Sequence, residues 1–383
     1  MNKKRKCILY LNRGSVLYGA ETRMLDILGH LDRTQFYPLV LLPARGPLSV
    51  RAEKMGIEVV FLNFDLGPRP SLGQVFKLNR EMFKVVRDYK VDIIHFNMHF
   101  GINHLWPLLI WMKGRTVVHL RSHFWIYPFE RFLIYRCAKI ICVSECIRNN
   151  FLQKRRSDFL TFIRKDKVKV IYDGIDIECF KPMPIENGLR QELGIRNQEK
   201  ILAVIGALHP VKGQDLVIEA ASFIIKEHPD VKVLLIGGIY LDNEVSFRYQ
   251  KSLEDRIKTL NLQDKVMLIG PRQDIARVMN EIDILLQPSE HEALGTSMIE
   301  AMACEKPVIG TAVDGIPEVI GPHEEAGLLL SVRTPQELAR LVSILLSDPA
   351  RSLEKGQQGR TRVEQEFNIY KTINKLQGIY QGL

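Results

Sequence analysis

Three absences narrow the classes of protein to which this chain of 383 residues belongs. The chain has no uninterrupted apolar run of the roughly 18 residues that a membrane-spanning helix needs. Its six cysteines form no Cys-x-x-Cys pair and have no histidine at metal-ligand spacing, so we expect reduced thiols and neither disulfides nor zinc sites. No Gly-x-Gly-x-x-Gly follows an expected strand, which argues against a nicotinamide-dependent oxidoreductase.

The start of the chain predicts a cytoplasmic protein. The basic segment MNKKRK precedes an apolar run at residues 7–11 that ends before Asn12. This run is too short for the apolar core of a signal peptide and fits a first β-strand. An apolar content of 46% and a charged content of 25% are ordinary for a soluble globular enzyme.

Charge is distributed unevenly along the chain, whose net charge is +9. Residues 1–185 hold 31 lysines and arginines against 16 aspartates and glutamates, whereas the remaining residues hold 22 against 28. A basic first half suggests an anionic partner such as a membrane surface or a phosphate-bearing acceptor; an ordinary basic surface is an equal alternative. Residues 125–136 mix aromatic and basic side chains, which fits either contact with a membrane interface or a buried aromatic core. No nucleic-acid recognition motif is present, so nucleic acid is not the expected partner.

Short apolar strands alternate with amphipathic helices in both halves of the chain. A length of 383 residues suggests about two domains. The alternation predicts an α/β protein with doubly wound parallel sheets. Residues 179–188, which include two prolines, have the composition of a linker. We therefore expect domains at residues 1–183 and 184–365, followed by a C-terminal helix at residues 366–383.

The most informative stretch, residues 283–320, has the pattern of one strand–loop–helix–strand unit. Residues 283–288 are an apolar run that ends at proline, as expected for a strand buried on both faces of a parallel sheet. A polar loop leads to a helix that begins near Gly295, and a second apolar strand follows at residues 307–311. The loop lies at the carboxyl end of a strand, where open parallel sheets bind ligands.

Two carboxylates frame this unit, Glu292 in the loop and Glu300 in the helix. Between them the amides of residues 294–296 lie near a helix start, where unpaired N–H groups and the helix dipole favour an anion. A carboxylate on either side of an anion site suits a polyhydroxylated ligand that carries phosphate, such as a sugar nucleotide. Taken without their neighbours, two glutamates are more often solvated surface residues.

Two glycine turns are further candidates for phosphate contact. Lys212 lies between Gly206 and Gly213 after an apolar strand at residues 201–205, and a lysine in such a turn offers a compact positive charge to a phosphate. Gly19 lies in a loop between the first strand and a helix, where the lack of a side chain lets the backbone approach a phosphate. The second signal is weak by itself, because many such loops are simple turns.

In order and spacing, the residues from Pro288 onward resemble the donor-binding signature of the family 4 retaining glycosyltransferases. The matching positions are Pro288, Ser289, Glu292, Gly295, Glu300, Ala301, Met302, Ala303, Pro307, Val308, Gly315 and Glu318. The resemblance covers nearly the whole chain and is most specific over residues 206–327. It implies the GT-B fold, in which two Rossmann-like domains face a central cleft, and a C-terminal helix that crosses back to the first domain.

The resemblance also assigns residues to a nucleotide-sugar donor. It places Glu300 on the ribose hydroxyls and Glu292 on the sugar hydroxyls. It places four backbone amides near the diphosphate and the sugar, those of Ala293, Leu294, Gly295 and Thr296. Gly206 begins the lysine turn, and Arg272 lies in the loop that borders the nucleotide base in the family.

The residues that the resemblance implies for catalysis are Lys212, Glu292 and His119. Lys212 matches the family's phosphate-binding lysine. His119 matches a histidine that ends a strand near the donor sugar, although an isolated histidine is more often structural. In this interpretation the two glutamates bind and orient the donor and do not act as the acid and nucleophile of a glycosidase.

The chain departs from the family pattern at two positions. Tyr18 stands where the family's glycine loop has its first glycine, so only Gly19 carries over. Ala207 stands where the family usually has an arginine in the Lys212 turn, which removes one expected phosphate contact. Three side chains are candidates to replace that contact: Arg13, His209 and Arg272.

Together these features predict a metal-independent hexosyltransferase that uses a UDP- or GDP-sugar. Lys212, Gly19 and the helix start at Gly295 would stabilise the leaving phosphate by preorganised charge. The chain has no Asp-x-Asp pair to bridge a metal to a diphosphate, so neither a metal nor another cofactor is expected. The expected acceptor is a sugar or a lipid-linked or polysaccharide intermediate of bacterial cell-surface glycan synthesis, at the inner face of the membrane.

Two other functions remain open at this point. A sugar-nucleotide epimerase or hydrolase on the same scaffold would also bind a UDP-sugar, and it would act on that donor without an acceptor. A non-catalytic donor-binding subunit would fit the alanine at position 207, and it would bind the donor without turnover.

Overall fold

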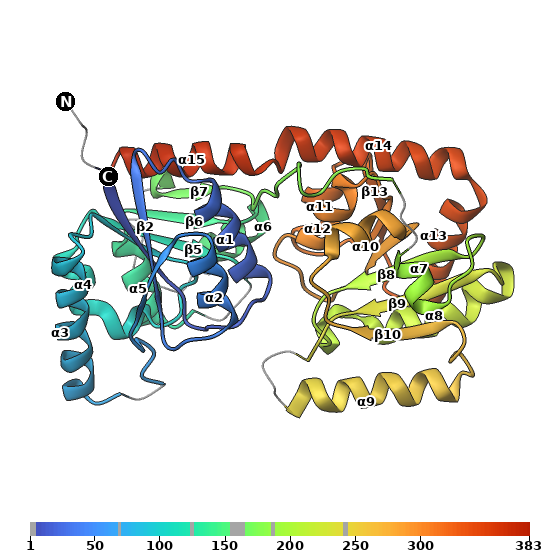
Figure 1. The fold of residues 1–383 in the computed structure, drawn as a ribbon, viewed down its shortest axis with the longest axis horizontal. Helices are drawn as coiled ribbons and strands as arrows, with labels where there is room; N and C mark the ends of the chain where they lie inside the picture. Colours follow the sequence, from blue (N-terminus) through green and yellow to red (C-terminus); the bar gives the residue numbers. More distant parts are fainter. Residues whose placement is uncertain (1–4, 68–69, 123–125, 154–164, 185–187, 240–243) are drawn as a thin grey trace. The chain divides into compact units, whose positions relative to one another are not determined.

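The computed structural model describes residues 5–67, 70–122, 126–153, 165–184, 188–239 and 244–383 (Figure 1). The chain forms two compact units, one made of Met1–Gly174 with Ile369–Leu383 and the other of Ile175–Asn368. We refer to them as unit 1 and unit 2. Each is built on a parallel sheet, which confirms the α/β architecture predicted for both halves.

Unit 1 contains a seven-stranded parallel sheet in the order β3-β2-β1-β4-β5-β6-β7. Its strands are β1 (Lys6–Leu11), β2 (Phe36–Leu42), β3 (Glu58–Phe61), β4 (Ile93–Phe96), β5 (Thr116–Leu120), β6 (Lys139–Cys142) and β7 (Val168–Val170). The central strands are mostly apolar, because helices bury both of their faces. The strand order reverses between β1 and β4, which places a topological switch point at their carboxyl ends.

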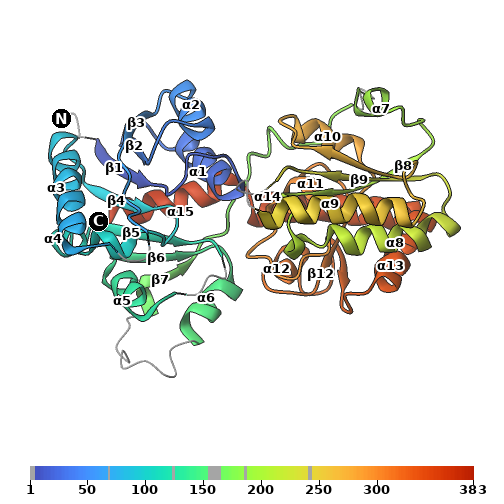
Figure 2. The same cartoon turned by 90° about the horizontal axis from the view of Figure 1, so that it is seen from below.

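The helices of unit 1 include the last helix of the chain. They are α1 (Gly19–His30), α2 (Pro47–Lys54), α3 (Leu72–Asp88), α4 (Trp106–Trp111), α5 (Pro128–Arg136), α6 (Glu145–Gln153) and α15 (Ile369–Gln381), with the short 3-10 helices η1 (Ile102–Leu105) and η2 (Lys165–Lys167). Met24 and Leu28 of α1 share one hydrophobic core with Ile373, Leu376 and Tyr380 of α15. Helix α15 is therefore part of unit 1, although the whole of unit 2 precedes it in the sequence (Figure 2).

Unit 2 contains a six-stranded parallel sheet in the order β10-β9-β8-β11-β12-β13. Its strands are β8 (Lys200–Ile205), β9 (Val231–Ile236), β10 (Val266–Gly270), β11 (Ile284–Gln287), β12 (Val308–Thr311) and β13 (Gly327–Leu330). Strand β11 lies between β8 and β12, and in its register with β12 Gln287 stands opposite Gly310. The strand–loop–helix–strand unit predicted over residues 283–320 is thus at the centre of this sheet.

Helices cover both faces of the unit 2 sheet. They are α7 (Gly188–Leu193), α8 (Gln214–Glu227), α9 (Glu244–Thr259), α10 (Ile275–Glu281), α11 (Thr296–Ala303), α12 (Ile316–Ile320), α13 (Pro335–Ser347) and α14 (Pro349–Glu366). Helices α8, α9 and α13 share one hydrophobic core with the sheet, and Figure 1 shows α9 and α14 on opposite sides of it. Among the helices of the described residues, none is both long enough and apolar enough to cross a membrane.

The units divide after Gly174 and before Ile369, whereas the composition of residues 179–188 places the first boundary at 183. Part of that proline-containing segment packs within unit 2. Met183 N donates a hydrogen bond to Asn280 Oδ1 of α10 at 2.8 Å. The prolines therefore mark an irregular segment of unit 2. Composition does not distinguish such a segment from a linker between domains, which is why it places the boundary too late.

A buried polar network crosses the face of the unit 1 sheet on which α15 packs. The hydroxyl of Tyr380 lies 2.5 Å from that of Tyr10 and 2.6 Å from His95 Nδ1. The ring of His95 lies 5.6 Å from the ring of His119, measured between centroids. His119 Nδ1 lies 3.1 Å from Arg121 Nη2, and all five side chains are buried.

The network continues along the carboxyl ends of the strands. Arg121 pairs with Asp173 and donates from Nε to Asn97 Oδ1 at 3.1 Å. Asn97 Nδ2 donates to Asn12 Oδ1 at 2.8 Å, and Asn12 Nδ2 donates to Glu21 Oε1 of α1 at 3.3 Å. Hydrogen bonds between side chains, and not apolar packing alone, therefore hold α1 and α15 to this edge of the sheet.

Three histidines of unit 1 are held neutral by their surroundings. Burial lowers the pKa of His95 to about 3 and that of His99 to about 4, and the nearby Arg121 and Arg13 add to the respective effects. Burial, Arg121 and His95 also lower the pKa of His119 well below its usual value. Within the described residues, Nε2 of His95 and Nε2 of His119 have no hydrogen-bond partner, so an imidazole that took up a second proton would be a poorly compensated buried charge.

The stability of unit 1 is expected to fall as the pH drops from about 6.5 toward 4. In this window the histidines of the unfolded chain bind protons and the three buried histidines of the folded unit do not, so the free energy of unfolding decreases. Each such histidine contributes a slope of at most about 1.4 kcal/mol per pH unit, and His95→Gln should remove one contribution. Urea unfolding followed by tryptophan fluorescence measures the slope for unit 1, because all three tryptophans belong to it. The exposed His323 provides the control His323→Gln, and a slope that His95→Gln leaves at the wild-type value would contradict this account.

Candidate active site

The turn that carries Lys212 lies at the carboxyl end of β8. It forms the 3-10 helix η3 (Pro210–Lys212) and ends at Gly213, whose φ of 70° is in the left-handed region. A Cβ atom on Gly213 would lie 2.4 Å from the carbonyl oxygen of Pro288. A backbone hydrogen bond from Glu290 N to the turn, 2.8 Å long, adds a second tie. Glycine is thus required here both by the backbone angle and by the close approach of the loop that follows β11.

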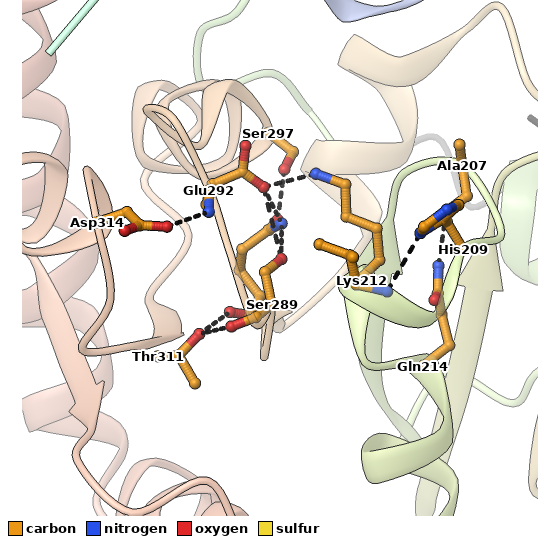
Figure 3. Close-up of polar contacts among 11 residues, drawn as sticks. Ala207, His209, Lys212, Gln214, Ser289, Glu292, Ser297, Thr311 and Asp314 are labelled. Atoms are coloured by element: carbon orange, nitrogen blue, oxygen red, sulfur yellow. Dashed lines mark hydrogen bonds and ion pairs between the residues drawn. The ribbon is translucent and has the colours of Figure 1, made fainter. Parts of the chain in front are cut away.

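The loop after β11 is held in place by the last residue of β12 and by residues that follow β12 in the sequence. Glu292 N donates to Asp314 Oδ2 at 3.1 Å, and Gly315 N donates to Glu292 O at 3.0 Å. The hydroxyl of Thr311 donates to Ser289 O at 2.5 Å. Hydrogen bonds at both its N–H and its C=O group therefore fix the backbone of Glu292; Figure 3 shows the bond to Asp314.

The structure brings together Lys212 and Glu292, which the sequence places in separate motifs. Lys212 Nζ lies 2.5 Å from Glu292 Oε2, so the two form an ion pair (Figure 3). The Lys212 side chain is 29% exposed and that of Glu292 is 15% exposed. The pair is screened less than a pair on the open surface, and both charged groups still have surface that a ligand can reach.

The amides predicted to bind an anion lie at the start of α11. Gly295 precedes this helix with a φ of 92° and a ψ of 57°, a conformation that favours glycine. The first amides of a helix lack partners within it, and the dipole of α11 adds to their attraction for a negative charge. Glu300 lies one helical turn after Thr296, so these two residues share one face of α11. Ala293 and Leu294 lead into this turn from Glu292.

Ala207 follows Gly206 at the end of β8 and brings no charge to the site. Gln214 Nε2 donates to Ala207 O at 3.0 Å, which joins the turn to the start of α8. A Cβ atom on Gly237 would lie 1.8 Å from Gly206 O, so the ends of β8 and β9 pack closely. Because the side chain of Ala207 is an uncharged methyl group, Lys212 supplies the positive charge of this turn.

Arg272 is engaged by two carboxylates. Its Nε and Nη2 donate to Asp274 at 2.8 Å each, and Nη1 and Nη2 donate to Glu192 at 2.7 and 3.0 Å. Hydrogen bonds to Asp274 and then to Glu192 raise the pKa of Arg272. All three nitrogen atoms of the guanidinium are thus used to join α7 to the loop after β10, which does not favour Arg272 as a replacement for the arginine absent at position 207.

The two other candidate replacements are also engaged. Arg13 forms an ion pair with Asp65, and its guanidinium lies 5.2 Å from the centroid of the Phe100 ring. His209 accepts a hydrogen bond from Val211 N at 3.3 Å, and burial, followed by the charge of Lys212, lowers its pKa. A neutral imidazole brings no positive charge to a phosphate.

The two site residues predicted in unit 1 differ in their accessibility. Gly19 is the first residue of α1, and a Cβ atom there would meet nothing within 4 Å, so packing does not require glycine at this position. Glu21, two residues later, accepts a hydrogen bond from Tyr18 N at 3.3 Å and brings a negative charge to this helix start. His119, in contrast, has no exposed surface and lies within the buried network of unit 1.

Sequence reasoning did not identify Gln287 and Ser297 as part of the site. Gln287 Nε2 donates to Glu292 Oε2 at 2.9 Å, and Ser297 Oγ donates to Gln287 Oε1 at 2.7 Å. The available signal was a glutamine at the end of a strand whose other residues are apolar. In the described residues no three His, Cys, Asp or Glu side chains are grouped as metal ligands, and the expected metal independence stays a prediction.

Comparisons with known proteins agree across most of the chain. The family described as "Glycosyltransferase Family 4" matches residues 18–179, and "Glycosyl transferases group 1" matches residues 186–362. D-inositol 3-phosphate glycosyltransferase of Kineococcus radiotolerans is 30% identical over 52% of this chain, and the match spans about half (48%) of that relative. N-acetyl-alpha-D-glucosaminyl L-malate synthase of Bacillus anthracis is 28% identical over 79% of this chain and 78% of its own length.

Solved structures give the same fold. The crystal structure of Anabaena HepE in complex with UDP and glucose has a TM-score of 0.84 and 26% identity, and the match covers 98% of this chain and 99% of HepE. WaaG, a glycosyltransferase involved in lipopolysaccharide biosynthesis, has a TM-score of 0.75 at 15% identity over 98% of this chain and all of WaaG, which is a likeness of fold alone. These matches, with the two parallel sheets and the two family matches, show that the chain belongs to the family 4, group 1 glycosyltransferases and has the GT-B fold.

Proposed function

We propose that this protein transfers a sugar from a UDP- or GDP-sugar to an acceptor, with retention of the anomeric configuration. The observation that carries the proposal is the convergence of Lys212 and Glu292 beside the first turn of α11. A cation, a carboxylate and free helix amides together suit a ligand with a diphosphate and hydroxyl groups. The match to HepE, whose structures include complexes with UDP and with UDP-glucose, supports a nucleotide-sugar donor.

In this proposal the site works by stabilising the leaving nucleotide. Negative charge grows on the diphosphate as the bond to the sugar breaks, and Lys212 with the first amides of α11 is placed to stabilise that charge. Glu292 orients the sugar and Glu300 the ribose, so that the reacting atoms are held in position. The proposal assigns the stabilisation of the diphosphate to these groups and to no metal ion.

The acceptor is proposed to be a sugar or a lipid-linked intermediate of cell-surface glycan synthesis, reached at the inner face of the membrane. Unit 1 holds 32 lysines and arginines against 14 aspartates and glutamates, whereas unit 2 holds 21 against 30. Large apolar side chains are exposed on three of its helices, namely Leu72 and Phe76 on α3, Ile110 and Trp111 on α4, and Phe129 and Phe132 on α5. Helix α4 packs against both α3 and α5 (Figure 2). Exposed aromatic residues combined with positive charge favour an anionic membrane surface; Trp125 of the predicted stretch lies outside the described residues.

A donor-binding protein without transferase activity is the second candidate. Ala207 leaves one lysine in the β8 turn, and that lysine is paired with Glu292. Calorimetry combined with an assay of nucleotide release distinguishes the two functions. A donor-binding protein binds the nucleotide sugar but releases no nucleotide with any acceptor.

Lys212→Ala should lower turnover more than about 10-fold. A hydrogen bond to a charged group contributes roughly 1.5 to 3 kcal/mol, and the substitution removes the positive charge of the turn. Release of UDP or GDP from a panel of nucleotide sugars, with and without extracted membrane lipids, measures the effect. Lys251→Ala, on the exposed surface of α9, is the matched control. A folded Lys212→Ala protein with wild-type turnover would show that Lys212 has no role.

Replacing both Phe129 and Phe132 by serine should weaken binding to anionic vesicles about 10-fold, because two partly exposed aromatic side chains no longer enter the interface. Co-sedimentation with vesicles of phosphatidylglycerol and phosphatidylcholine measures the change. Phe223 and Phe247 are exposed on unit 2, and the same change at these two positions is the control. Equal binding by both double variants, or equal binding to pure phosphatidylcholine, contradicts the assignment of this surface.

A further inference from the structure

Two buried polar side chains lie beside Glu292 in unit 2. Gln287 ends β11 and is 2% exposed, and Ser289 is 0% exposed. The other residues of β11 are apolar, as expected for a central strand of a parallel sheet. A buried amide or hydroxyl group is costly unless it is hydrogen-bonded. Packing alone would be served by an apolar residue at either position.

The hydrogen bonds around Gln287 fix the orientation of its amide group. Ser297 Oγ donates to Gln287 Oε1 at 2.7 Å, and Gln287 Nε2 donates to Ser289 Oγ at 2.8 Å and to Glu292 Oε2 at 2.9 Å. A carboxylate only accepts hydrogen bonds, so the NH₂ group of the amide must face Glu292 and its oxygen must face Ser297. We name Gln287, Ser289 and Ser297 the Glu292 clamp; Figure 3 labels Ser289 and Ser297 beside Glu292.

The clamp and Lys212 act on one oxygen atom of Glu292. Lys212 Nζ lies 2.5 Å from Oε2, Gln287 Nε2 lies 2.9 Å from it and Ser289 Oγ lies 3.5 Å from it. Three donors on Oε2 restrict rotation of the carboxylate. The other oxygen, Oε1, is then the acceptor that this carboxylate presents to a ligand.

Resting on the proposed function, we propose that Gln287 and Ser297 are positioning residues that hold Glu292 Oε2, so that Oε1 accepts a hydrogen bond from a hydroxyl group of the donor sugar. Ser297 acts through Gln287, and Gln287 acts through Glu292. Neither residue contacts the nucleotide in this proposal.

The clamp also explains how Glu292 keeps its orientation when a donor is bound. A lysine that contacts a diphosphate shares its charge with that anion and holds Glu292 less tightly. The neutral donors Gln287 and Ser289 come from the protein interior and do not compete for the phosphate. They hold the Glu292 carboxylate in place while Lys212 contacts the diphosphate.

A double-mutant cycle tests the proposal. Ser297→Ala and Gln287→Leu are made in the wild-type protein and in Glu292→Ala, and the full chain is assayed with UDP and UDP-glucose, or with GDP and GDP-mannose if guanine nucleotides bind more tightly. Calorimetry gives the affinity for the nucleotide and for the nucleotide sugar, and nucleotide release gives kcat and KM. Ser222→Ala in α8 and Gln250→Leu in α9 are matched controls, because the Ser222 hydroxyl donates a hydrogen bond to a carbonyl of its own helix and Gln250 donates one to Glu254.

We expect Ser297→Ala and Gln287→Leu each to lower kcat about 10-fold and to leave the affinity for the nucleotide alone within about 2-fold. In the Glu292→Ala protein neither substitution should have a further effect, since the residue through which both act is absent. Ser297→Thr keeps the hydroxyl group and should restore activity.

Three results would overturn the proposal. If the effects of the clamp variants multiply with that of Glu292→Ala, the clamp does not act through Glu292. If the affinity for the nucleotide falls as much as kcat does, Gln287 and Ser297 support the whole site and do not position one carboxylate. If the wild-type protein binds neither nucleotide sugar, the proposed function fails, and Glu292 has no donor sugar to which the clamp could orient it. The first two results leave the proposed function intact.

Discussion

The ion pair between Lys212 and Glu292 depends on the order of strands in the unit 2 sheet. The two residues are far apart in the sequence, yet β8 and β11 are neighbours, and the carboxyl ends of parallel strands meet at one edge. The contact between Gly213 and Pro288 sets how closely the two loops approach. A cation and a carboxylate thereby meet beside the start of α11, and every role assigned to this site follows from that meeting.

The same arrangement limits how much positive charge the site offers. Ala207 supplies no cation, Arg272 is held by Asp274 and Glu192, and Lys212 is partly neutralised by its own partner. The amides of α11 are then a large share of the attraction for a diphosphate. This balance makes the orientation of Glu292 important, because a carboxylate turned toward the phosphates would repel them. Hydrogen bonds that the buried Gln287 and Ser289 donate to Glu292 restrict that orientation.

Local patterns in the sequence were enough to predict the alternating strands and helices, the glycine turns and the two glutamates. They did not reveal contacts between distant segments. The pairing of Arg272 with Glu192 crosses 80 residues, and that of Tyr380 with Tyr10 crosses 370. A glutamine at the end of an apolar strand was visible, but its meaning required Ser297 and Glu292 in three dimensions. His119 was predicted from a strand-end position, and its complete burial beside His95 and Arg121 could not be read from that position.

The most direct test is a crystal structure of the protein soaked with UDP or GDP. The account predicts that the diphosphate lies within hydrogen-bond distance of Lys212 Nζ and the first amides of α11, with the ribose hydroxyls on Glu300. A nucleotide bound elsewhere, with the Lys212–Glu292 pair unchanged and no ligand near Glu300, would contradict it.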